Sequence, residues 1–413
     1  MVWLSGISLV LFLALCYLIT RKFQFDKSAI AGLLLKILAG ISLGLIYKYF
    51  YKGGDTFQYF REASIIARFF LDHPRDFVSI YFDTPHVAEL GEQIVFYEQP
   101  RALLFSKIIS FFYVLTGGNY WMISAFLSLL NFVCIYFLVT ELNKSYSEIR
   151  NAVKISFYFL PTFVFWTSGL LKESLTIGVM AVAFALVLRF IRTKDTTYSL
   201  WMYLVFLLWL LWELKYYYAA IAIPLLIAML LYDLVLKRYS IYPIFILAIF
   251  SLGILLVSTL HYNLNLSRVF NVMYENYQLG IQNSENGIIR YYCFDGNWLG
   301  FLLNSPIALF SGLFRPTIFE SNNVWQLIVA LENLVVFCFL VIGLWKTRLQ
   351  ISGSNPLVIV ALLFVVSLAT LLAYTTPNLG TLSRYKEGYW PIFVLLVLVL
   401  FLKQQKRPDS HRI

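Results

Sequence analysis

One carboxylate in this sequence stands where a catalytic base would be useful. Asp55 follows Gly53 and Gly54 directly, just beyond an apolar stretch at about residues 29–51. The two glycines carry no side chain, so a bulky substrate can approach the carboxylate closely. A carboxylate beside an apolar surface can accept the proton of a hydroxyl group. We therefore expect Asp55 to act as a base and Tyr59, in the same stretch, to contact the substrate.

A helix cap is the competing interpretation of Asp55. An Asp at the start of a helix with a Gln three residues later, here Gln58, is typical of a capping box. The helix that follows has apolar residues at near-helical spacing and charged residues between them, which predicts an amphipathic helix lying in the membrane interface. Its apolar residues are Phe57, Phe60, Ile65, Ile66, Phe69 and Phe70. The two roles of Asp55 are compatible.

The segment Arg384-Tyr385-Lys386 is the best candidate for binding a phosphate. An Arg offers paired donors to phosphate oxygens, and a Lys adds a point charge. The alternative is a simple solvated turn, but two cations on the outer face run against the preference for basic residues on the cytoplasmic side. We expect Arg384, Tyr385 and Lys386 to contact the substrate.

A second polar segment, residues 168–173, interrupts a long apolar stretch. It ends in Lys172 and Glu173, and each charge is costly within the bilayer, by about 2.5–3.5 kcal/mol at its centre. We expect Lys172 to face a phosphate and Glu173 to bind a sugar hydroxyl or to take a second catalytic role. The alternative for both is an interfacial turn from which long side chains reach the lipid surface. Arg315, next to Pro316, is a further substrate-binding candidate.

The composition places these residues in a polytopic membrane protein of the all-α class. The chain has 413 residues, of which 60% are hydrophobic and 13% are charged, whereas soluble domains carry about 25% charged residues. A span needs about 20 apolar residues, and runs of that length recur along the chain. Basic residues at the cytoplasmic ends of spans explain the net charge of +10. We therefore expect the lipid bilayer, and no nucleic acid, as a partner.

Cysteines and histidines predict neither a disulfide framework nor a metal site. Three of the four cysteines lie in apolar runs, the fourth stands alone in a polar loop, and the four histidines are scattered. No cofactor is indicated by these residues. Residues 1–20 have no basic residue before the apolar run, whereas Arg21, Lys22 and Lys27 follow it. That order predicts a retained first span that starts outside.

Basic loops taken as cytoplasmic predict about eleven spans in a single domain, residues 1–413. The expected spans are about 2–20, 29–51, 120–142, two within 155–190, two within 199–235, 241–260, 323–345, 356–374 and 390–402. Polar breaks separate the paired spans at residues 168–174 and 213–217.

Two long outer loops, residues 52–118 and 261–322, are each expected to hold an amphipathic helix. Each loop also contains a short apolar segment, at residues 103–116 and 299–314. These segments are too short to span a membrane, so we expect them to be re-entrant or to lie on the surface.

In layout, residues 29–192 resemble the GT-C superfamily of membrane glycosyltransferases, which use polyprenyl-phosphate-linked sugars. The shared features are an acidic residue just after a span (Asp55), an amphipathic helix after it, a Pro-led apolar segment that ends in Gly-Gly (residues 100–118), a span with a basic inner loop, and the polar motif at 168–173. The segment Arg384-Tyr385-Lys386 near the end of the chain is a weaker point of resemblance to the same superfamily. This chain has Gly-Asp-Thr where many members have an Asp-Glu pair, so the resemblance does not carry over a divalent-metal site.

The resemblance implies an inverting sugar transfer at the outer face of a membrane. Asp55 would deprotonate a hydroxyl group of a glycan or lipid acceptor, which attacks the anomeric carbon while polyprenyl phosphate leaves. Arg384, Lys386 and Lys172 would offset the charge on that phosphate. A divalent metal is not compulsory, because the leaving group already carries its charge as a phosphate ester. The compact loops favour a bacterial inner membrane, with the site on the periplasmic face and a role in making a cell-envelope polysaccharide.

Two other classes of protein remain open. A polysaccharide polymerase, or an enzyme like an O-antigen ligase, would use the same kind of donor but depend on Arg268 and Arg290 of the second outer loop more than on Asp55. A transporter of lipid-linked glycans would need polar residues along a path through the bilayer. The spans here are nearly uncharged at mid-depth, and no pair of Gly- or Pro-broken helices recurs in the two halves.

Overall fold

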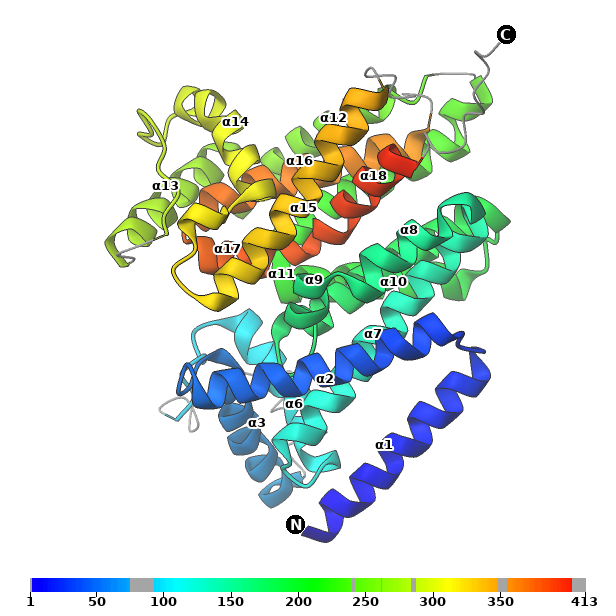
Figure 1. Cartoon of the computed structure of the whole chain (residues 1–413), viewed down its shortest axis with the longest axis vertical. Helices are drawn as coiled ribbons and strands as arrows, with labels where there is room; N and C mark the ends of the chain where they lie inside the picture. Colours follow the sequence, from blue (N-terminus) through cyan, green and yellow to red (C-terminus); the bar gives the residue numbers. More distant parts are fainter. Residues whose placement is uncertain are drawn as a thin grey trace. The chain divides into compact units, whose positions relative to one another are not determined.

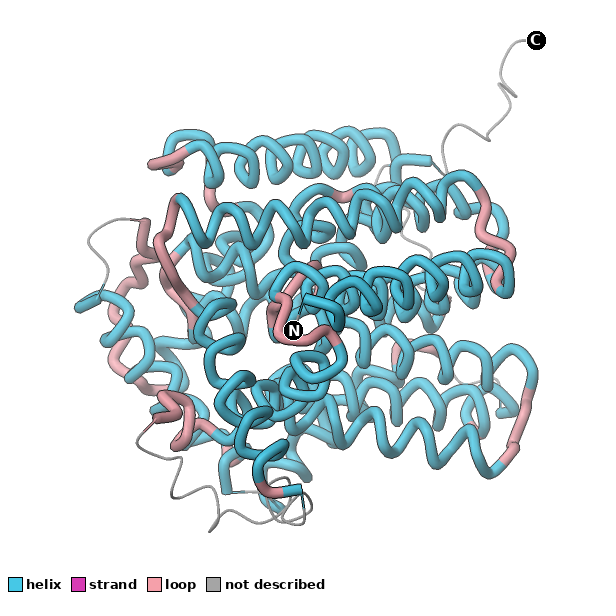
Figure 2. The backbone as a smooth tube through the Cα atoms, turned by 90° about the horizontal axis from the view of Figure 1, so that it is seen from below, coloured by secondary structure: helices cyan, strands magenta, loops and turns pink. Residues whose placement is uncertain are grey.

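The structure, a computed structural model, describes residues 2–74, 93–239, 242–260, 262–283, 287–347 and 355–402. Parts of the two predicted outer loops, residues 75–92 and 284–286, lie outside the described residues. The described part of the chain is helical and contains no strand (Figure 2). One isolated β-bridge joins Ile288 and Asn378. The prediction of an all-α protein is confirmed for these residues.

Figure 1 labels the helices in chain order. Up to residue 145 they are α1 (Val2–Lys22), α2 (Lys27–Tyr49), α3 (Asp55–Asp72), α6 (Pro100–Leu115) and α7 (Tyr120–Ser145). Next come η3 (Ser147–Ile149), α8 (Arg150–Lys154), η4 (Ile155–Phe159), α9 (Pro161–Trp166), α10 (Lys172–Thr193), α11 (Tyr198–Leu234) and η5 (Leu236–Tyr239). The remainder are α12 (Phe245–Leu260), η6 (Tyr262–Leu264), α13 (Leu266–Asn283), α14 (Trp298–Phe314), η7 (Ile318–Glu320), α15 (Val324–Thr347), α16 (Pro356–Thr375), α17 (Leu379–Tyr385), η8 (Lys386–Gly388) and α18 (Trp390–Leu402).

Six helices of the described residues are long and apolar enough to cross a membrane, namely α2, α7, α10, α11, α15 and α16. A seventh span is formed if α17 with η8 and α18, which are bent by 71° at their junction, cross together. α12 and α14 are apolar but shorter. The protein is therefore a helical integral membrane protein, and the count of eleven spans stays a prediction.

Two of the predicted breaks between spans can be compared directly with the structure. α11 has non-helical backbone angles at Lys215 (φ −149°, ψ 86°), so the break expected at residues 213–217 is confirmed. The first span expected within 155–190 consists of two short helices, η4 and α9, and the short helix α8 precedes them. Leu160 is extended there (φ −70°, ψ 114°), because the residue before a proline, here Pro161, is disfavoured in helical geometry.

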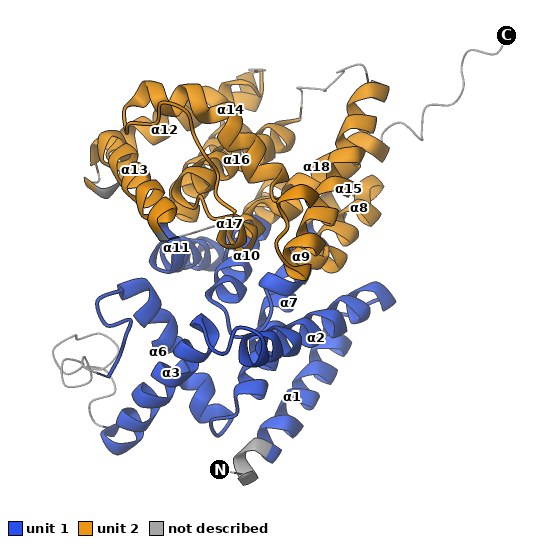
Figure 3. Cartoon of the chain, turned by 60° about the vertical axis from the view of Figure 1, so that its left-hand side comes forward, with its two compact units in different colours: residues 1–141, 164–185, 197–216 blue, residues 142–163, 186–196, 217–413 orange. Residues whose placement is uncertain are grey.

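The chain divides into two compact units (Figure 3). The first unit comprises residues 1–141, 164–185 and 197–216, and the second comprises 142–163, 186–196 and 217–413. The expected single domain stays a prediction. Each unit has its own set of packed helices and its own buried polar groups.

In the first unit, α3 and α6 pack together along an aromatic core. The rings of Tyr59 and Phe105 meet edge to face with centroids 4.8 Å apart, and those of Phe60 and Tyr113 are 5.5 Å apart. The buried face of α3 also carries Ile66, while its Arg61 is exposed. The prediction that α3 is amphipathic is therefore confirmed, and its place at a membrane interface stays a prediction. α6 begins at its proline, as expected for a residue without an N–H at the first helical position.

Also in the first unit, the turn before α10 lies directly against α2. A Cβ atom added to Gly40 would be 2.9 Å from the backbone nitrogen of Gly169. Ser128 of α7 accepts a hydrogen bond from that same nitrogen (2.9 Å), and Ser124 donates to the carbonyl of Gly40 (3.0 Å). Small residues and two hydroxyls thus fix the polar segment at residues 168–173 against two long apolar helices.

In the second unit, α14 packs on α16 and α15 packs on α18. α14 approaches α16 so closely that a Cβ atom added to Gly312 would lie 2.4 Å from the carbonyl oxygen of Ala369. Phe314, at the end of α14, contacts the rings of Phe337 and Phe393, with centroids 5.1 and 5.8 Å away. These contacts pack together the helices of the second unit, which also contains the candidate residues Arg315, Arg384, Tyr385 and Lys386.

Replacing Gly169 by Ala should destabilise the protein. Gly169 has φ +70° and no room for a Cβ atom, since Ser124 Oγ and Gly40 Cα would be 2.9 and 3.1 Å away. Strain of this kind costs about 1–3 kcal/mol, which would appear as a lower melting temperature in detergent. The matched control is Gly6→Ala, because an added Cβ there meets nothing within 4 Å. Equal melting temperatures for the two variants would contradict the close approach of α2 to this turn.

Candidate functional site

Asp55 is the first residue of α3 and its side chain is exposed. α2 ends at Tyr49, so the carboxylate follows an apolar helix by only a few residues. A negative charge in the first turn of a helix is stabilised by the unpaired N–H groups there. Asp55 is therefore held on a rigid element and remains accessible to a substrate.

The capping box proposed for Asp55 is not formed. Gly54 occupies the N-cap position and has no side chain to cap with, so Asp55 lies one position inside the helix. Gln58 donates from Nε2 to Glu62 Oε1 (3.0 Å) instead of turning back to the helix start. The reason is the backbone of Gly54, whose φ of +111° sets the chain direction without a capping side chain.

The two glycines before Asp55 serve different purposes. A Cβ atom on Gly54 would lie 2.7 Å from the ring of Tyr47, whereas one on Gly53 would meet nothing within 4 Å. The N–H of Gly53 donates to the carbonyl of Tyr47 (3.0 Å). The chain thus folds back tightly on the end of α2, and open space lies beside Gly53.

Tyr59 is buried, with 4% of its surface exposed. Its ring contacts Phe105 and also Phe96, the latter with centroids 4.9 Å apart. Its role in the α3–α6 core is therefore clear, and its predicted contact with substrate stays a prediction. Nearer to Asp55, the hydroxyls of Thr56 and Tyr120 share a buried hydrogen bond of 2.7 Å.

Glu62 is a buried acid that the sequence analysis left out. Its carboxylate accepts hydrogen bonds from Gln58 Nε2, from the backbone N–H of Phe96 (3.0 Å) and from Ser106 Oγ (2.9 Å). Glu62 lies on the same helical face as Tyr59, and that spacing was the signal in the sequence that could have marked it as buried. It joins α3, α6 and the segment before α6.

Glu173 and Lys215 form a buried ion pair in the first unit. The Nζ–Oε1 distance is 2.8 Å, and 1% and 3% of the respective side chains are exposed. Lys172, the first residue of α10, is half-buried beside Glu173. The sequence analysis placed both charges of the pair in breaks between spans but did not join them. The sequence does show opposite charges in two neighbouring breaks, but that signal does not specify which residues pair.

A buried lysine lies within α2 and was also missed. Lys36 is 1% exposed and donates from Nζ to the backbone carbonyl of Thr167 (3.0 Å) and to its hydroxyl. An ionisable group inside a span is costly unless it has polar partners. Lys36 thus ties α2 to the start of the 168–173 segment.

The segment Arg384-Tyr385-Lys386 lies at the end of α17 in the second unit. Lys386 is fully buried, bonds through Nζ to Asn333 Oδ1, and lies 3.9 Å from the centre of the Trp390 ring. Arg384 and Tyr385 are half-buried. The ammonium of Lys386 therefore has partners within the protein, and phosphate binding by this segment stays a prediction.

Glu332, which is half-buried, belongs to the same polar network of the second unit. Its carboxylate accepts hydrogen bonds from the backbone N–H and the hydroxyl of Thr162 (2.9 and 2.5 Å) and from Trp390 Nε1 (2.5 Å). A carboxylate in the apolar helix α15 is thereby satisfied by one residue in the first turn of α9 and one at the start of α18.

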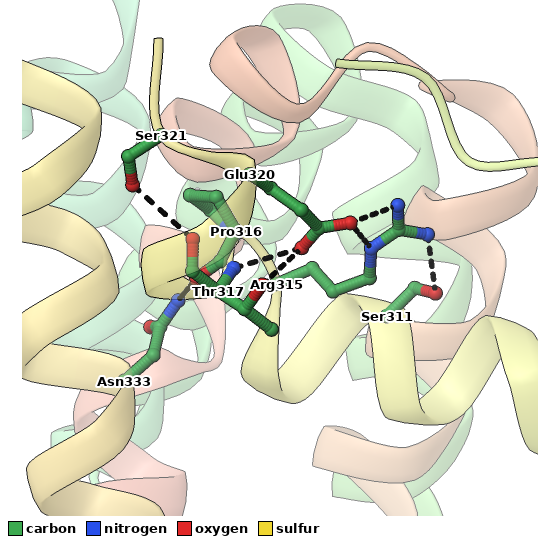
Figure 4. Close-up of polar contacts among 7 residues, drawn as sticks. All are labelled: Ser311, Arg315, Pro316, Thr317, Glu320, Ser321 and Asn333. Atoms are coloured by element: carbon green, nitrogen blue, oxygen red, sulfur yellow. Dashed lines mark hydrogen bonds and ion pairs between the residues drawn. The ribbon is translucent and has the colours of Figure 1, made fainter. Parts of the chain in front are cut away.

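Arg315 is engaged by its own loop (Figure 4). It donates from Nε to Glu320 Oε1 (2.7 Å), and Glu320 Oε2 accepts from the N–H and hydroxyl of Thr317 (2.8 and 2.9 Å). Asn333 donates to the carbonyl of Pro316 (3.0 Å), which joins the loop to α15. Arg315 thus closes the loop between α14 and α15, and its predicted contact with substrate stays a prediction.

The candidate residues fall into two groups. Asp55, Tyr59, Lys172 and Glu173 belong to the first unit, and Arg315, Arg384, Tyr385 and Lys386 belong to the second. A cavity shared by Asp55 and the late cations stays a prediction. Among the residues that the structure describes, no group of three or more His, Cys, Asp or Glu side chains could hold a metal ion.

Comparison with known proteins adds no relative. No family model, no curated protein and no solved structure matches the chain. What the site can do is therefore argued from its own groups. The first unit offers an exposed carboxylate at a helix start, together with the buried lysines Lys36 of α2 and Lys215 of α11.

Replacing one residue of the Glu173–Lys215 pair should lower the stability of the protein more than replacing both. Glu173→Gln leaves a buried ammonium without its counter-ion, and the loss of one partner of such a pair costs about 3–5 kcal/mol. The double variant Glu173→Gln with Lys215→Met leaves no uncompensated charge, so its melting temperature should lie above that of Glu173→Gln alone. Additive losses in this double-mutant cycle would show that the two side chains do not interact.

The Glu320 loop should lose stability in acid. Burial raises the pKa of Glu320, but the hydrogen bonds from Arg315 and Thr317 and the charge of Arg315 together lower it below its ordinary value of 4.5. A lowered folded-state pKa means that the stabilisation is present above pH 4.5 and is lost as the pH falls through the folded-state value. The melting temperatures of wild type and Glu320→Gln should therefore differ at pH 7 and converge below pH 4.5. A constant difference would rule out this linkage.

Proposed function

We propose that the protein is a membrane glycosyltransferase with Asp55 as its base. It transfers a sugar from a polyprenyl-phosphate donor to a glycan or lipid acceptor, with inversion at the anomeric carbon. The observation that carries the proposal is the exposed carboxylate at the start of α3, a few residues beyond the apolar helix α2. A base at the end of a span lies at the depth where the head group of a lipid-linked donor is expected.

In the proposed reaction, the acceptor hydroxyl gives its proton to Asp55 as its oxygen bonds to the anomeric carbon. The bond from that carbon to the phosphate oxygen breaks, and polyprenyl phosphate leaves with the electron pair. Arg384, Lys386 and Lys172 offset the charge of the phosphate. Glu173 binds a sugar hydroxyl or takes a second catalytic role, and Tyr59, Arg315 and Tyr385 complete the substrate contacts.

The finer features of the fold belong to the same proposal. We propose about eleven spans in the arrangement of the GT-C superfamily. We place the site on the periplasmic face of a bacterial inner membrane, where the product would enter a cell-envelope polysaccharide.

Asp55→Asn should abolish most of the sugar transfer. General base catalysis contributes about 10²–10⁴-fold, so turnover of a lipid-linked sugar in membranes should fall by that factor at an unchanged expression level. The control is Asp72→Asn, which removes the same charge from the exposed last residue of α3 and should leave turnover unchanged. Wild-type turnover by Asp55→Asn would remove the proposal.

The same assay tests the alternative enzyme class. Arg268→Ala and Arg290→Ala should have small effects on a transferase that uses Asp55. Loss of activity only in these two variants would instead favour a polysaccharide polymerase or an enzyme like an O-antigen ligase.

A further inference from the structure

Arg101 is a cation of the first unit to which the proposed reaction assigns no role. It is the second residue of α6 and is half-buried. Its guanidinium lies over the ring of Tyr216, with Cζ 4.3 Å from the ring centre. A tyrosine face holds a guanidinium flat and leaves its edge free for hydrogen bonds in the plane.

The edge of this guanidinium has no partner in the described part of the chain. Nε is buried and makes no hydrogen bond. Arg101 takes no part in the ion pairs of Arg189, Lys194, Lys215 and Arg315 that the described residues form. Arg101 is thus a half-buried cation without a counter-ion, and one of its N–H groups is buried without a hydrogen bond. Burial of such a cation costs desolvation free energy, which a bound anion would offset.

The position of Tyr216 under Arg101 is set by the break in α11. Lys215, the residue before it, has non-helical backbone angles, and its ammonium is held by Glu173 at 2.8 Å. The buried ion pair therefore fixes the point at which α11 leaves helical geometry. The next residue supplies the ring on which Arg101 rests. Three elements, α6, α10 and α11, thus combine to orient one guanidinium.

We propose that Arg101 binds a phosphate ester, specifically the phosphate of the lipid-linked donor. The two Nη groups of a guanidinium present N–H donors in one plane, and this fork matches two oxygens of a phosphate. The inference rests on the proposed function for the identity of the ligand, and on the geometry of Arg101 alone for its phosphate chemistry. Lys172, the half-buried first residue of α10, adds a cation next to the ion pair that fixes this geometry.

Binding of farnesyl phosphate to the full-length protein in lipid nanodiscs tests the site without requiring turnover. Arg101→Gln should weaken binding by about tenfold or more, because a charge-assisted, two-point contact is lost. Arg101→Lys keeps the charge but loses the fork, so it should bind with intermediate affinity. Tyr216→Leu removes the ring beneath the guanidinium and should also weaken binding. The matched control is Arg61→Gln, which removes an exposed arginine of the same unit and should bind as wild type does.

Two further probes separate the sources of the phosphate. Farnesol, which lacks the anion, should bind poorly to wild type and should not respond to Arg101→Gln. Inorganic phosphate that competes with farnesyl phosphate at equal affinity would support the anion site but overturn its assignment to a lipid-linked ligand. Wild-type affinity of Arg101→Gln and Arg101→Lys for farnesyl phosphate, at an unchanged melting temperature, would overturn the site itself.

The phosphate site of Arg101 and the role of Asp55 as a base can be refuted separately. If Asp55→Asn keeps full turnover while Arg101→Gln loses farnesyl phosphate, the phosphate site stands and the base assignment falls. If Arg101→Gln binds farnesyl phosphate as wild type does while Asp55→Asn is inactive, the base assignment stands and the phosphate site falls.

Discussion

The constraint on which this structure depends is that a charged or polar side chain inside an apolar bundle must have a partner. The Glu173–Lys215 pair is the clearest case, since both side chains are almost fully buried and their charged atoms are 2.8 Å apart. Both side chains are shielded from water by the packed helices, so the alternative to pairing is the cost of burying an uncompensated charge. The pair joins the start of α10 to the break in α11.

The same constraint accounts for the other buried polar groups. Glu62 gathers donors from α3, α6 and the backbone before α6, and Lys36 finds the carbonyl and hydroxyl of Thr167. In the second unit Glu332 accepts from Thr162 and Trp390. Each of these groups joins segments that are far apart in the sequence. Polar contacts of this kind give positional specificity, whereas apolar packing alone tolerates shifts between helices.

The charged side chains also differ in their exposure. Lys215, Arg315 and Lys386 are strong cations by residue type, but their charged groups already contact protein partners. Asp55 is exposed at a helix start, and the guanidinium of Arg101 has only a tyrosine face beneath it. Exposure, together with charge, therefore makes Asp55 the candidate for the base.

The sequence by itself determined the membrane class, the helical character, the amphipathic α3, the helix start at Pro100 and the break at Lys215, because composition, periodicity and local backbone preferences act over a few residues. It also placed Asp55 next to the end of an apolar helix. Only the tertiary structure decided that Gly54 takes the cap position, that Glu173 meets Lys215, and that Arg101 rests on Tyr216. Those outcomes depend on side chains more than 40 residues apart in the chain, or on the approach of Gly54 to Tyr47, and no local pattern specifies which distant partner will satisfy a buried charge.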